Sequence, residues 1–581
     1  MIENKSFLGK NWKISEFDQR KSLMISQRYK LNELTSKILT IRNIKEEDLD
    51  FFLNPDIKNH LPDPYILKDM KKSTDKVYQS ILQNDKVGII ADYDVDGSTS
   101  CALIVKFFQY LNIKIYIETP DRINEGYGPN KRIIDKFIKK NVQLILILDC
   151  GTSSHELLRK KNLNSIDTII IDHHISELTL PDVYGIINPN RFDENNNLKN
   201  LSAVGITFLF LVALRRKLRL ENYYSNNNIK EQNLTSYLDL VALGTVCDVV
   251  SLTNINRLYV KKGLEVISQR INRGITSLID ISKIRNEPDT YDLSFIIGPK
   301  LNAASRIGDA TLSSKILYSS DLIEIESISK KLNLLNEKRK LIEKKMIEEA
   351  KEQALLKLNN KVIIVESYNW HLGVLGIVAS KLVDEFKKPA IVISKNDNYG
   401  IGSARSIIGI DLGLLIINAK EKGILINGGG HKMAAGLKIS NKKIKNFLDF
   451  LENNVDLKYL NTNNFATKID SLITLEEIND NFFENIEIMK PFGQDNPEPN
   501  FIIKNLKLDF IKRIKEKHLL LSLSNDFGNT IKGFCFNVSD TNLGENLIKS
   551  QHKRIDIITH IKKDQYYKNE PQLIITDAKY S

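Results

Sequence analysis

Apolar runs of four or five residues recur in the first half of the chain. They cover residues 87–91, 144–148 and 168–171, and helical patterns of apolar and polar positions separate them, as at residues 130–140. Continuous apolar runs of this length are typical of parallel strands that are buried on both faces, with helices covering the sheet. The pattern over residues 76–250 therefore predicts an α/β domain built on a parallel sheet.

The pattern changes after residue 255. Residues 255–360 have a helical pattern, and the charged segment 327–358 lacks glycine and proline, which predicts a long connecting helix with a solvated face. An apolar run at residues 361–365 then opens a second α/β pattern, which continues to about residue 456.

The C-terminal region alternates short apolar runs with polar turns. Strands are predicted at residues 501–508, 519–524, 530–536, 555–561 and 573–577. Five strands in about 80 residues predict an oligonucleotide-binding barrel (OB-fold), with a generic β-barrel or sandwich as the alternative. The predicted parts of the chain are an N-terminal helical segment (1–75), the first α/β domain with its helices (76–320), the connecting helix (321–360), the second α/β domain (361–456) and the barrel (465–581), with a linker at Asn461-Thr462-Asn463-Asn464.

Acidic residues follow each predicted strand of the first domain. The first run leads into Asp92-Tyr93-Asp94-Val95-Asp96-Gly97, the second into Asp149, and the third into Asp172-His173-His174. Ligands of such sheets gather at the carboxyl ends of the strands. Alternate positions along a strand also face the same side, so we expect Asp92, Asp94 and Asp96 to converge. Crowded carboxylates repel one another unless a hard cation lies between them, which predicts a metal site.

Two simpler interpretations of the acidic turn are a solvated loop and a calcium loop. A calcium loop of the EF-hand kind needs a glutamate at its twelfth position, and that position is Leu103 here, which excludes it. A fourth acid, Asp248, closes the apolar run 241–247. A lone acid there would be a helix cap or a turn residue, but beside the other acids we interpret Asp248 as a further ligand.

Composition adds a basic excess. Lys and Arg outnumber Asp and Glu by 83 to 72, which gives a net charge of +11 and suits a polyanionic partner. The four cysteines have no paired spacing, so neither a disulfide framework nor a zinc knuckle is predicted. No run approaches 18 apolar residues and the N-terminus does not open a signal peptide, so we expect a cytoplasmic protein with no membrane association.

These motifs resemble those of a known family. Asp172-His173-His174 is the name-giving motif of the DHH phosphoesterases, and residues 92–97 are similar to their first motif. Further motifs extend the resemblance, over about residues 40–580, to the RecJ family of single-strand-specific exonucleases. They lie at residues 122–128 (RINEGYG), 298–306 (GPKLNAASR), 370–380 (WHLGVLGIVAS), 402–406 (GSARS), 428–436 (GGGHKMAAG) and 491–499 (PFGQDNPEP).

The resemblance implies a fold and a function. The fold is a parallel-sheet DHH domain joined by a long helix to a second α/β domain of the DHHA1 type, and the resemblance favours an OB-fold for the C-terminal strands. The implied function is a metal-dependent exonuclease that degrades single-stranded DNA from 5′ to 3′ and releases 5′ mononucleotides, in DNA recombination and repair. The implied partners are single-stranded DNA, single-strand-binding protein and a DNA helicase.

The resemblance also implies a ligand set for two ions, Mn²⁺ or Mg²⁺, that clamp the attacking and leaving oxygens of a phosphodiester. One ion is expected on Asp96, Asp149, His173 and Asp248, and the other on Asp94 and the bridging Asp149, with Asp92 in support. Many relatives place a histidine four residues before the acid that corresponds to Asp94. Ile90 stands there in this chain, as in RecJ proteins, so we expect the second ion to be held more weakly.

Other motif residues are expected to bind substrate. His174 would contact a phosphate oxygen or the leaving group, with Asp172 orienting the histidine pair. Arginine offers a planar charged fork for phosphate, and glycine exposes backbone amides. The expected 5′-phosphate pocket comprises Arg122, Ser403 and Arg405, with further contacts from Gly429, Gly430 and His431. Asn302 and Arg306 are expected near the scissile phosphate, and Tyr127 as a base-stacking platform.

Each of these residues also has a structural explanation: a surface salt bridge for arginine, the core for tyrosine, a turn for glycine. Two other functions stay open as well. One is a DHH-family phosphodiesterase that acts on short oligonucleotides or cyclic dinucleotides, and the other is an inactive strand-binding scaffold.

Overall fold

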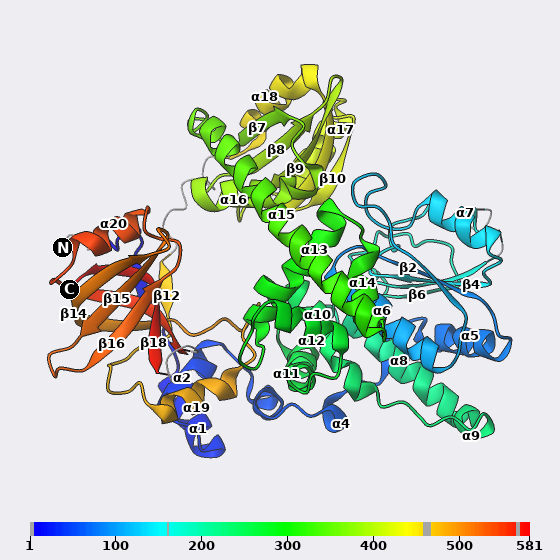
Figure 1. Ribbon diagram of the computed structural model, residues 1–581, viewed down its shortest axis with the longest axis horizontal. Coiled ribbons are helices and arrows are strands. Elements are labelled where there is room, and N and C mark those ends of the chain that lie inside the picture. The colour runs from blue at the N-terminus through cyan, green and yellow to red at the C-terminus, as the bar shows by residue number, and fades with distance from the viewer. Residues whose placement is uncertain (1–4, 160–161, 165, 457–465, 565–569) are drawn as a thin grey trace. The chain divides into compact units, whose positions relative to one another are not determined.

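The computed structural model describes residues 5–159, 162–164, 166–456, 466–564 and 570–581, so the predicted linker at 461–464 lies outside the described residues. The chain forms two compact units (Figure 1). One unit combines Met1–His60, Ser251–Arg257 and Thr462–Ser581, and the other combines Leu61–Val250 with Leu258–Asn461. Among the described residues, no helix is long and apolar enough to cross a membrane.

The first domain of the larger unit contains the predicted parallel sheet. Its strands are β2 (Val87–Ala91), β3 (Ile115–Glu118), β4 (Leu144–Leu148), β5 (Asp167–Ile171) and β6 (Gly185–Ile187). They pair in parallel in the order β3-β2-β4-β5-β6. The order reverses between β2 and β4, and ligands of open α/β sheets bind at such a switch point, at the carboxyl ends of the strands.

Helices cover this sheet and extend the domain. The apolar face of α7 (Lys131–Lys139) packs on residues from β2, β4, β5 and β6. The other helices around the sheet are α5 (Met70–Leu82), α6 (Val95–Tyr110) and α8 (Ala203–Leu220), and the short α9 (Tyr223–Asn226) packs against α8. The helical region then comprises α10 (Leu238–Cys247), α11 (Asn254–Ser268), α12 (Arg273–Ile281), a π-helix at Asp292–Ile297, α13 (Gly298–Ile307) and α14 (Thr311–Tyr318). The long connecting helix is α15 (Leu322–Leu355), which runs to the second α/β domain (Figure 1).

The second α/β domain has a mixed sheet. Its elements are β7 (Ile363–Tyr368), α16 (Leu375–Phe386), β8 (Ala390–Lys395), β9 (Tyr399–Arg405), α17 (Leu412–Glu421), β10 (Asn427–His431), β11 (Ala434–Ser440) and α18 (Ile444–Asn454). The order is β10-β11-β9-β8-β7, in which only β7 and β8 pair in parallel. One face of this sheet packs with α15 and α16, and the other with α17 and α18.

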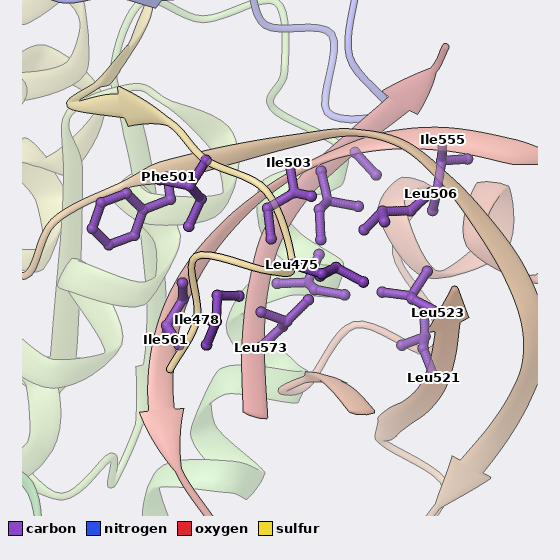
Figure 2. Close-up of a cluster of buried hydrophobic side chains, with 14 of the residues drawn as sticks. Leu475, Ile478, Phe501, Ile503, Leu506, Leu521, Leu523, Ile555, Ile561 and Leu573 are labelled. Atoms are coloured by element: carbon purple, nitrogen blue, oxygen red, sulfur yellow. The ribbon is translucent and has the colours of Figure 1, made fainter. Parts of the chain in front are cut away.

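The smaller unit contains a closed barrel. Its strands are β14 (Phe501–Ile514), β15 (His518–Ser524), β16 (Thr530–Cys535), β17 (Arg554–Lys563) and β18 (Pro571–Tyr580). They pair in the order β14-β15-β16-β18-β17, and β17 returns to β14. Apolar side chains from every strand fill the interior, among them Leu506, Leu521 and Leu573 (Figure 2). The closure and the helix α20 (Asn542–Lys549) between β16 and β17 confirm the OB-fold prediction.

The N-terminal residues belong to the same unit as the barrel. The helices are α1 (Gln19–Tyr29), α2 (Glu33–Ile41), α3 (Leu49–Leu53), α4 (Ile57–His60) and, from the C-terminal region, α19 (Asp480–Met489). The strand β1 (Trp12–Ile14) pairs in parallel with β12 (Thr467–Ile469), and β13 (Ser471–Leu472) pairs with the start of β14. The Trp12 indole donates to a carboxylate oxygen of Asp577 at 3.0 Å, which ties the N-terminal strand to β18.

Candidate metal centre

The acids predicted from the strand ends meet at the switch point of the parallel sheet. Asp92 follows β2 directly, and its backbone N–H donates to the carbonyl of Leu148 at the end of β4 (3.2 Å). The backbone N–H of Asp149 makes the equivalent hydrogen bond one strand further along, to the carbonyl of Ile171 at the end of β5 (2.9 Å). The N–H of Asp172 donates in the same way to the carbonyl of Ile187 at the end of β6 (3.1 Å). The strand pairing therefore extends to the acidic residues themselves and holds them side by side. Asp149 also has φ 61°, a strained left-handed conformation of the kind that concentrates at functional sites.

The route by which Asp94 and Asp96 converge differs from the prediction. We expected alternation along one strand, but β2 ends at Ala91 and a helix follows. Asp94 is the N-cap of α6, where it accepts a hydrogen bond from the N–H of Gly97 at 3.0 Å, and Asp96 lies in the first turn. A Cβ at Gly97 would lie 2.4 Å from the carbonyl oxygen of Asp92, so this tight strand-to-helix turn requires glycine.

Asp248 is likewise the C-cap of α10 rather than a strand end. Asp248 can therefore be both a helix cap and a metal ligand, because the packing of α10 brings its C-terminal end to the acidic cluster. His173 lies at the centre of that cluster. Its Nε2 is 3.4 Å from Oδ1 of Asp149, 3.6 Å from Oδ2 of Asp248 and 4.0 Å from Oδ2 of Asp96.

The ligand atoms form three overlapping groups, within each of which all atoms lie within 4.8 Å of one another. The groups are Asp92, Asp94 and Asp149; Asp96, His173 and Asp248; and Asp149, His173 and His174. Asp149 belongs to two groups and so stands where a bridging ligand would be needed. Asp96 is fixed further by the N-terminus of α8, since its oxygens accept from the N–H groups of Ala203 (2.6 Å) and Val204 (2.8 Å).

The raised pKa values of the clustered carboxyl groups indicate a site for cations. Burial, followed by repulsion from neighbouring carboxylates, raises the pKa of Asp96 to about 7 and that of Asp248 to about 9. The same causes raise the pKa of Asp92 and Asp149 well above the ordinary value. Oδ1 of Asp92, Oδ1 of Asp149 and Oδ2 of Asp248 are buried without a hydrogen-bond partner, an arrangement that is costly unless a cation is bound.

His173 is suited to be the neutral ligand of such ions. Burial and the proximity of His174 lower the pKa of His173 to about 4, so its imidazole is uncharged at neutral pH. Buried carboxylates with unsatisfied oxygens and one neutral imidazole therefore fit divalent cations that prefer oxygen ligands. The residues present fit the metals that the resemblance implies.

Asp172 is positioned to orient the second histidine. Its Oδ1 lies 2.7 Å from Nδ1 of His174, while Oδ2 accepts from the hydroxyl of Thr152 at 2.6 Å. Burial opposes ionisation of both groups, but the contact with Asp172 outweighs it and raises the pKa of His174. Asn188 completes the support by donating to the hydroxyl of Thr152 (3.0 Å) and to the carbonyl of His174 (2.8 Å). No sequence signal pointed to Asn188, because it lies after another strand and outside the quoted motifs.

Tyr127 contacts this centre in a way that was not predicted. Its hydroxyl donates to the carbonyl of Asp149 at 2.8 Å and lies 3.0 Å from Nδ1 of His174. The residue is nevertheless 52% exposed, so its ring keeps a face toward solvent. Tyr127 therefore supports the metal centre through its hydroxyl and leaves the ring available for the predicted stacking role.

Three predicted arginines come together from three segments. Arg122 stacks on Tyr93, with its Cζ 4.7 Å from the ring centroid, and Nη1 of Arg306 donates to the carbonyl of Gly373 at 2.9 Å. Burial and the nearby charges of Arg122, Arg339 and Arg405 lower the pKa of Arg306 to about 9, and burial and Arg122 lower that of Arg405. Within the described ranges, none of Arg122, Arg306 and Arg405 has a carboxylate within 4.0 Å, which excludes the salt-bridge explanation for them.

Ser403 and Arg405 lie on β9 of the second sheet, whereas Asn302 lies on α13 of the first domain. Arg405 donates to the carbonyl of Ala404 at 2.9 Å and approaches the hydroxyl of Ser403 at 3.3 Å. Gly376 in the first turn of α16 permits this arrangement, because a Cβ there would lie 2.9 Å from Nη2 of Arg405. Gly376 lies in the motif at 370–380, but the sequence alone did not distinguish it as functional. Asn302, on α13, has a buried Oδ1 without a hydrogen-bond partner.

The glycine cluster forms an open strip on the edge of this sheet. Gly429 pairs with Gly436, which pairs in turn with Ser403, so the three lie in a row across β10, β11 and β9. A Cβ added at Gly429 or Gly436 would meet no atom within 4 Å, and His431 is exposed on the same edge strand. The protein itself does not require glycine at Gly429, because no neighbouring atom would meet a side chain there. Gly430 differs, because its φ of 155° and a Cβ position 2.4 Å from the carbonyl oxygen of Ala434 make it structurally required.

Comparisons with known proteins agree with this architecture. Family models match three regions: the DHH family N-terminal domain at residues 86–245, the DHHA1 domain at residues 359–456 and the RecJ OB domain at residues 469–577. The single-stranded-DNA-specific exonuclease RecJ of Bacillus subtilis (strain 168) is 31% identical over 98% of this chain and 71% of its own length. The protein of the same name from Escherichia coli (strain K12) is 32% identical over 81% of this chain and 84% of its own.

Solved structures are similar as well. The crystal structure of RecJ in complex with Mn²⁺ from Thermus thermophilus superposes with a TM-score of 0.80 at 22% identity, over 98% of this chain and 80% of that one, which shows the fold. The crystal structure of exonuclease RecJ bound to manganese is 28% identical with a TM-score of 0.58, over 67% of this chain and 94% of that one. The predicted DHH, DHHA1 and OB architecture is confirmed.

Proposed function

The chain belongs to the RecJ family of the DHH phosphoesterases, and from this premise we propose that it is an exonuclease that hydrolyses single-stranded DNA from the 5′ end with the help of two divalent cations. One observation carries the proposal: buried carboxylates with unsatisfied oxygens lie beside three arginines that have no carboxylate partner in the described chain. Cations on the carboxylates and phosphates on the arginines would satisfy both sets of charges at once.

The two ions would be Mn²⁺ or Mg²⁺. RecJ of Thermus thermophilus has been crystallised in complex with Mn²⁺ and with Mg²⁺, and the oxygen-rich ligand set with one imidazole suits both ions. We assign Asp96, Asp149, His173 and Asp248 to one ion, and Asp92, Asp94 and Asp149 to the other. Bound there, the ions would supply Lewis-acid polarisation of the phosphodiester and of the attacking water.

The chain's own groups bind and orient the phosphodiester. His174 is held by Asp172, which favours its protonated form and makes it a hydrogen-bond donor toward a phosphate oxygen or the leaving group. We assign Arg306 and Asn302 to the scissile phosphate, where the guanidinium would neutralise charge that develops in the transition state. Removing the charge of Arg306 would slow the reaction, because water screens charges only weakly in a buried site.

We assign the 5′ end of the strand to the second domain. Arg405, Ser403 and Arg122 would hold a terminal 5′ phosphate, and the open strip at Gly429 would let the strand lie against the backbone, with Gly430 and His431 beside it. A pocket that accepts a phosphate monoester recognises the end of a strand rather than its interior. This end recognition supports the 5′-to-3′ direction and the release of 5′ mononucleotides.

The barrel would hold the incoming strand. The outer face of β14, β15 and β16 carries Lys512, Leu520 and Phe534 as consecutive cross-strand partners. Phe534 lies 4.5 Å from Phe536 between ring centroids, and the Phe536 ring is exposed. Strands 2 and 3 of OB-folds bind oligonucleotides, and exposed aromatic rings stack on bases of any sequence.

We infer a role in DNA recombination and repair, in the cytoplasm, with single-strand-binding protein and a DNA helicase as partners, because single strands arise where such proteins work. The barrel and the aromatic face argue against a phosphodiesterase for short oligonucleotides or cyclic dinucleotides. The complete set of acids argues against an inactive strand-binding scaffold.

Digestion of single strands labelled at either end tests the proposal. With Mn²⁺ and a 5′-phosphorylated oligonucleotide of about 30 nucleotides, we expect the 5′ label to appear at once as a mononucleotide, whereas the 3′ label passes through a ladder of shorter strands. The same sequence in a blunt duplex should resist, and chelator should stop all cleavage. Early release of the 3′ label as a mononucleotide would reverse the assigned direction, and digestion confined to dinucleotides would favour the short-substrate enzyme.

A further inference from the structure

The buried side of the long connecting helix α15 is polar in its middle. Asn336 is buried there, and the side chains of Arg339 and Glu343 are only 13% and 16% exposed. The buried residues on either side of this polar stretch are mostly apolar. They are Ile325, Ile328, Ser329 and Leu332 before it, and Met346, Ala350 and Ala354 after it. Polar groups on the packed side of a helix need polar partners, so the polar stretch marks a place where α15 faces something other than the core.

Arg339 is held in place but keeps unused donors. Its Nη1 donates to Oε2 of Glu343 at 2.7 Å, and its Nε donates to the side-chain oxygen of Asn336 at 3.2 Å. A guanidinium has five N–H donors, and within the described ranges Nη2 of Arg339 makes no hydrogen bond. The basic residue also precedes the acid by four positions, which is the less favourable order along a helix. Helix stability alone therefore does not account for a half-buried pair in this place.

Arg339 lies beside the end of α13, the helix that carries Arg306. The two helices α13 and α15 pack against each other (Figure 1). Gly308 follows Arg306 by two residues and lies so close to α15 that a Cβ there would be 2.9 Å from the side chain of Leu335. Leu335 and Arg339 are four residues apart and so are neighbours on one side of α15. The guanidinium of Arg339 is thus one helical turn from the point where the end of α13 touches α15.

The charges around this point do not balance. Arg122, Arg306 and Arg405 have no carboxylate partner in the described chain, and Glu343 is the only one there for Arg339. The charge of Arg339 also helps to lower the pKa of Arg306, as do the charges of Arg122 and Arg405. Four guanidinium groups and one carboxylate call for a ligand with several negative charges, and a DNA strand carries one on each phosphate.

We propose that Arg339 binds a backbone phosphate of the strand next to the phosphate assigned to Arg306, and that Glu343 is the counter-ion that balances its charge while no strand is bound. The inference rests on the proposed function and adds a phosphate subsite on α15 to it. A bound phosphate is attracted by Arg339 and repelled by Glu343. Loss of the two side chains should therefore have opposite effects on strand affinity, whereas loss of either partner of a structural ion pair has the same effect.

Binding of a 5′-phosphorylated oligonucleotide of about eight nucleotides tests this, measured by fluorescence anisotropy in chelator over a series of salt concentrations. Arg339→Gln should weaken binding by about tenfold, the scale of one charge-assisted hydrogen bond. It should also reduce the slope of log Kd against log salt concentration by about 0.7, the share of one phosphate contact on a single strand. Glu343→Gln should tighten binding by about threefold although it removes the ion pair, and the double variant should bind like Arg339→Gln. The values of kcat/KM in Mn²⁺ should follow the same order.

The same helix offers a matched control. Lys344 and Glu348 have the same order and spacing as Arg339 and Glu343, but their side chains are 67% and 63% exposed. Lys344→Gln and Glu348→Gln should each leave the affinity within about twofold of the parent's and the salt slope unchanged. Arg339→Lys keeps the charge but not the planar fork, so it should keep the salt slope and lose part of the affinity. Should Arg339→Gln be insoluble, Arg339→Lys and Glu343→Gln still carry the test.

The outcomes are distinct. Binding by Glu343→Gln that is no tighter than the parent's, or a salt slope that Arg339→Gln leaves unchanged, would overturn the inference, and so would an equal gain in affinity in Glu348→Gln. Cleavage of single strands by the parent would leave the proposed function intact in each of these cases. A parent protein that neither binds nor cleaves single strands would overturn the proposed function itself.

Discussion

Replacing Arg405 by alanine tests the assignment of the 5′ end most directly. Nη1 of Arg405 is already engaged by the carbonyl of Ala404 and lies near the hydroxyl of Ser403, so the guanidinium is fixed before any substrate binds. Burial and the neighbouring Arg122 lower its pKa, which means that a bound anion would relieve an unfavourable local charge. The side chain is therefore organised for one phosphate group in one place.

The expected magnitude follows from the kind of contact. A hydrogen bond to a charged group contributes about 1.5–3 kcal/mol, which corresponds to a factor of roughly 10–150. Arg405→Ala should therefore reduce kcat/KM on a 5′-phosphorylated strand by about this factor and leave kcat/KM on the 5′-hydroxyl strand nearly unchanged. Arg405→Lys keeps the charge but loses the planar fork, so it should lie between the two.

The assay is the initial rate of mononucleotide release from one sequence with either 5′ end, at one fixed salt concentration. Arg270→Ala, which removes an exposed arginine paired with Asp280, controls for the loss of one surface charge. The reasoning is refuted if Arg405→Ala keeps the parent's full preference for the phosphorylated end, or if Arg270→Ala reduces that preference equally.

Four other outcomes are expected. Asp149→Ala should abolish cleavage in saturating Mn²⁺, and turnover above a tenth of the parent rate would contradict the bridging role of Asp149. Its affinity for a long single strand, measured by fluorescence anisotropy, should stay within about threefold of the parent's, because phosphate contacts elsewhere dominate binding. Phe536→Ser should weaken binding of a long oligonucleotide by the roughly 1–3 kcal/mol of one stacked base and spare cleavage of very short strands. Gly429→Ala should leave the melting temperature unchanged and impair cleavage, whereas Gly430→Ala should lower the melting temperature, since only the second Cβ meets backbone. In the presence of a chelator, the melting temperature should fall as the pH rises from about 5 to 9. The reason is that the carboxyl group of Asp248 has a pKa of about 9 in the native state and an ordinary pKa in the unfolded state, so over this range only the native state keeps it protonated. Bound Mn²⁺ should remove this dependence of the melting temperature on pH.

Local sequence determined the strands and which residues follow them. Runs of four or five apolar residues can be buried on both faces only within a sheet that helices cover, so β2, β4 and β5 were predicted within a residue or two. The acids Asp92 and Asp149 then had to lie at strand ends. The motifs, through their resemblance to a family, supplied the DHHA1 domain and the choice of an OB-fold over another small barrel, which periodicity could not provide.

Other features depend on contacts that no pattern encodes. Asp94 and Asp96 converge because a helix begins at residue 95, not because of strand alternation, and Asp248 reaches the cluster through the packing of α10. The period of a short acidic stretch cannot distinguish a strand from a strand-to-helix turn.

Arg257 is the clearest case of a residue whose role only the tertiary structure decided. In the sequence it stands between Asn256 and Leu258, and nothing in the local pattern marks it as a buried charge. In the fold it is fully buried against three carbonyls from residues 52, 488 and 489. Apolar periodicity reports burial along one element, whereas these acceptors come from segments about 200 residues away in either direction. Hydrogen bonds between distant segments leave no periodic trace in the chain, and so the tertiary structure alone determines where such a charge can be buried.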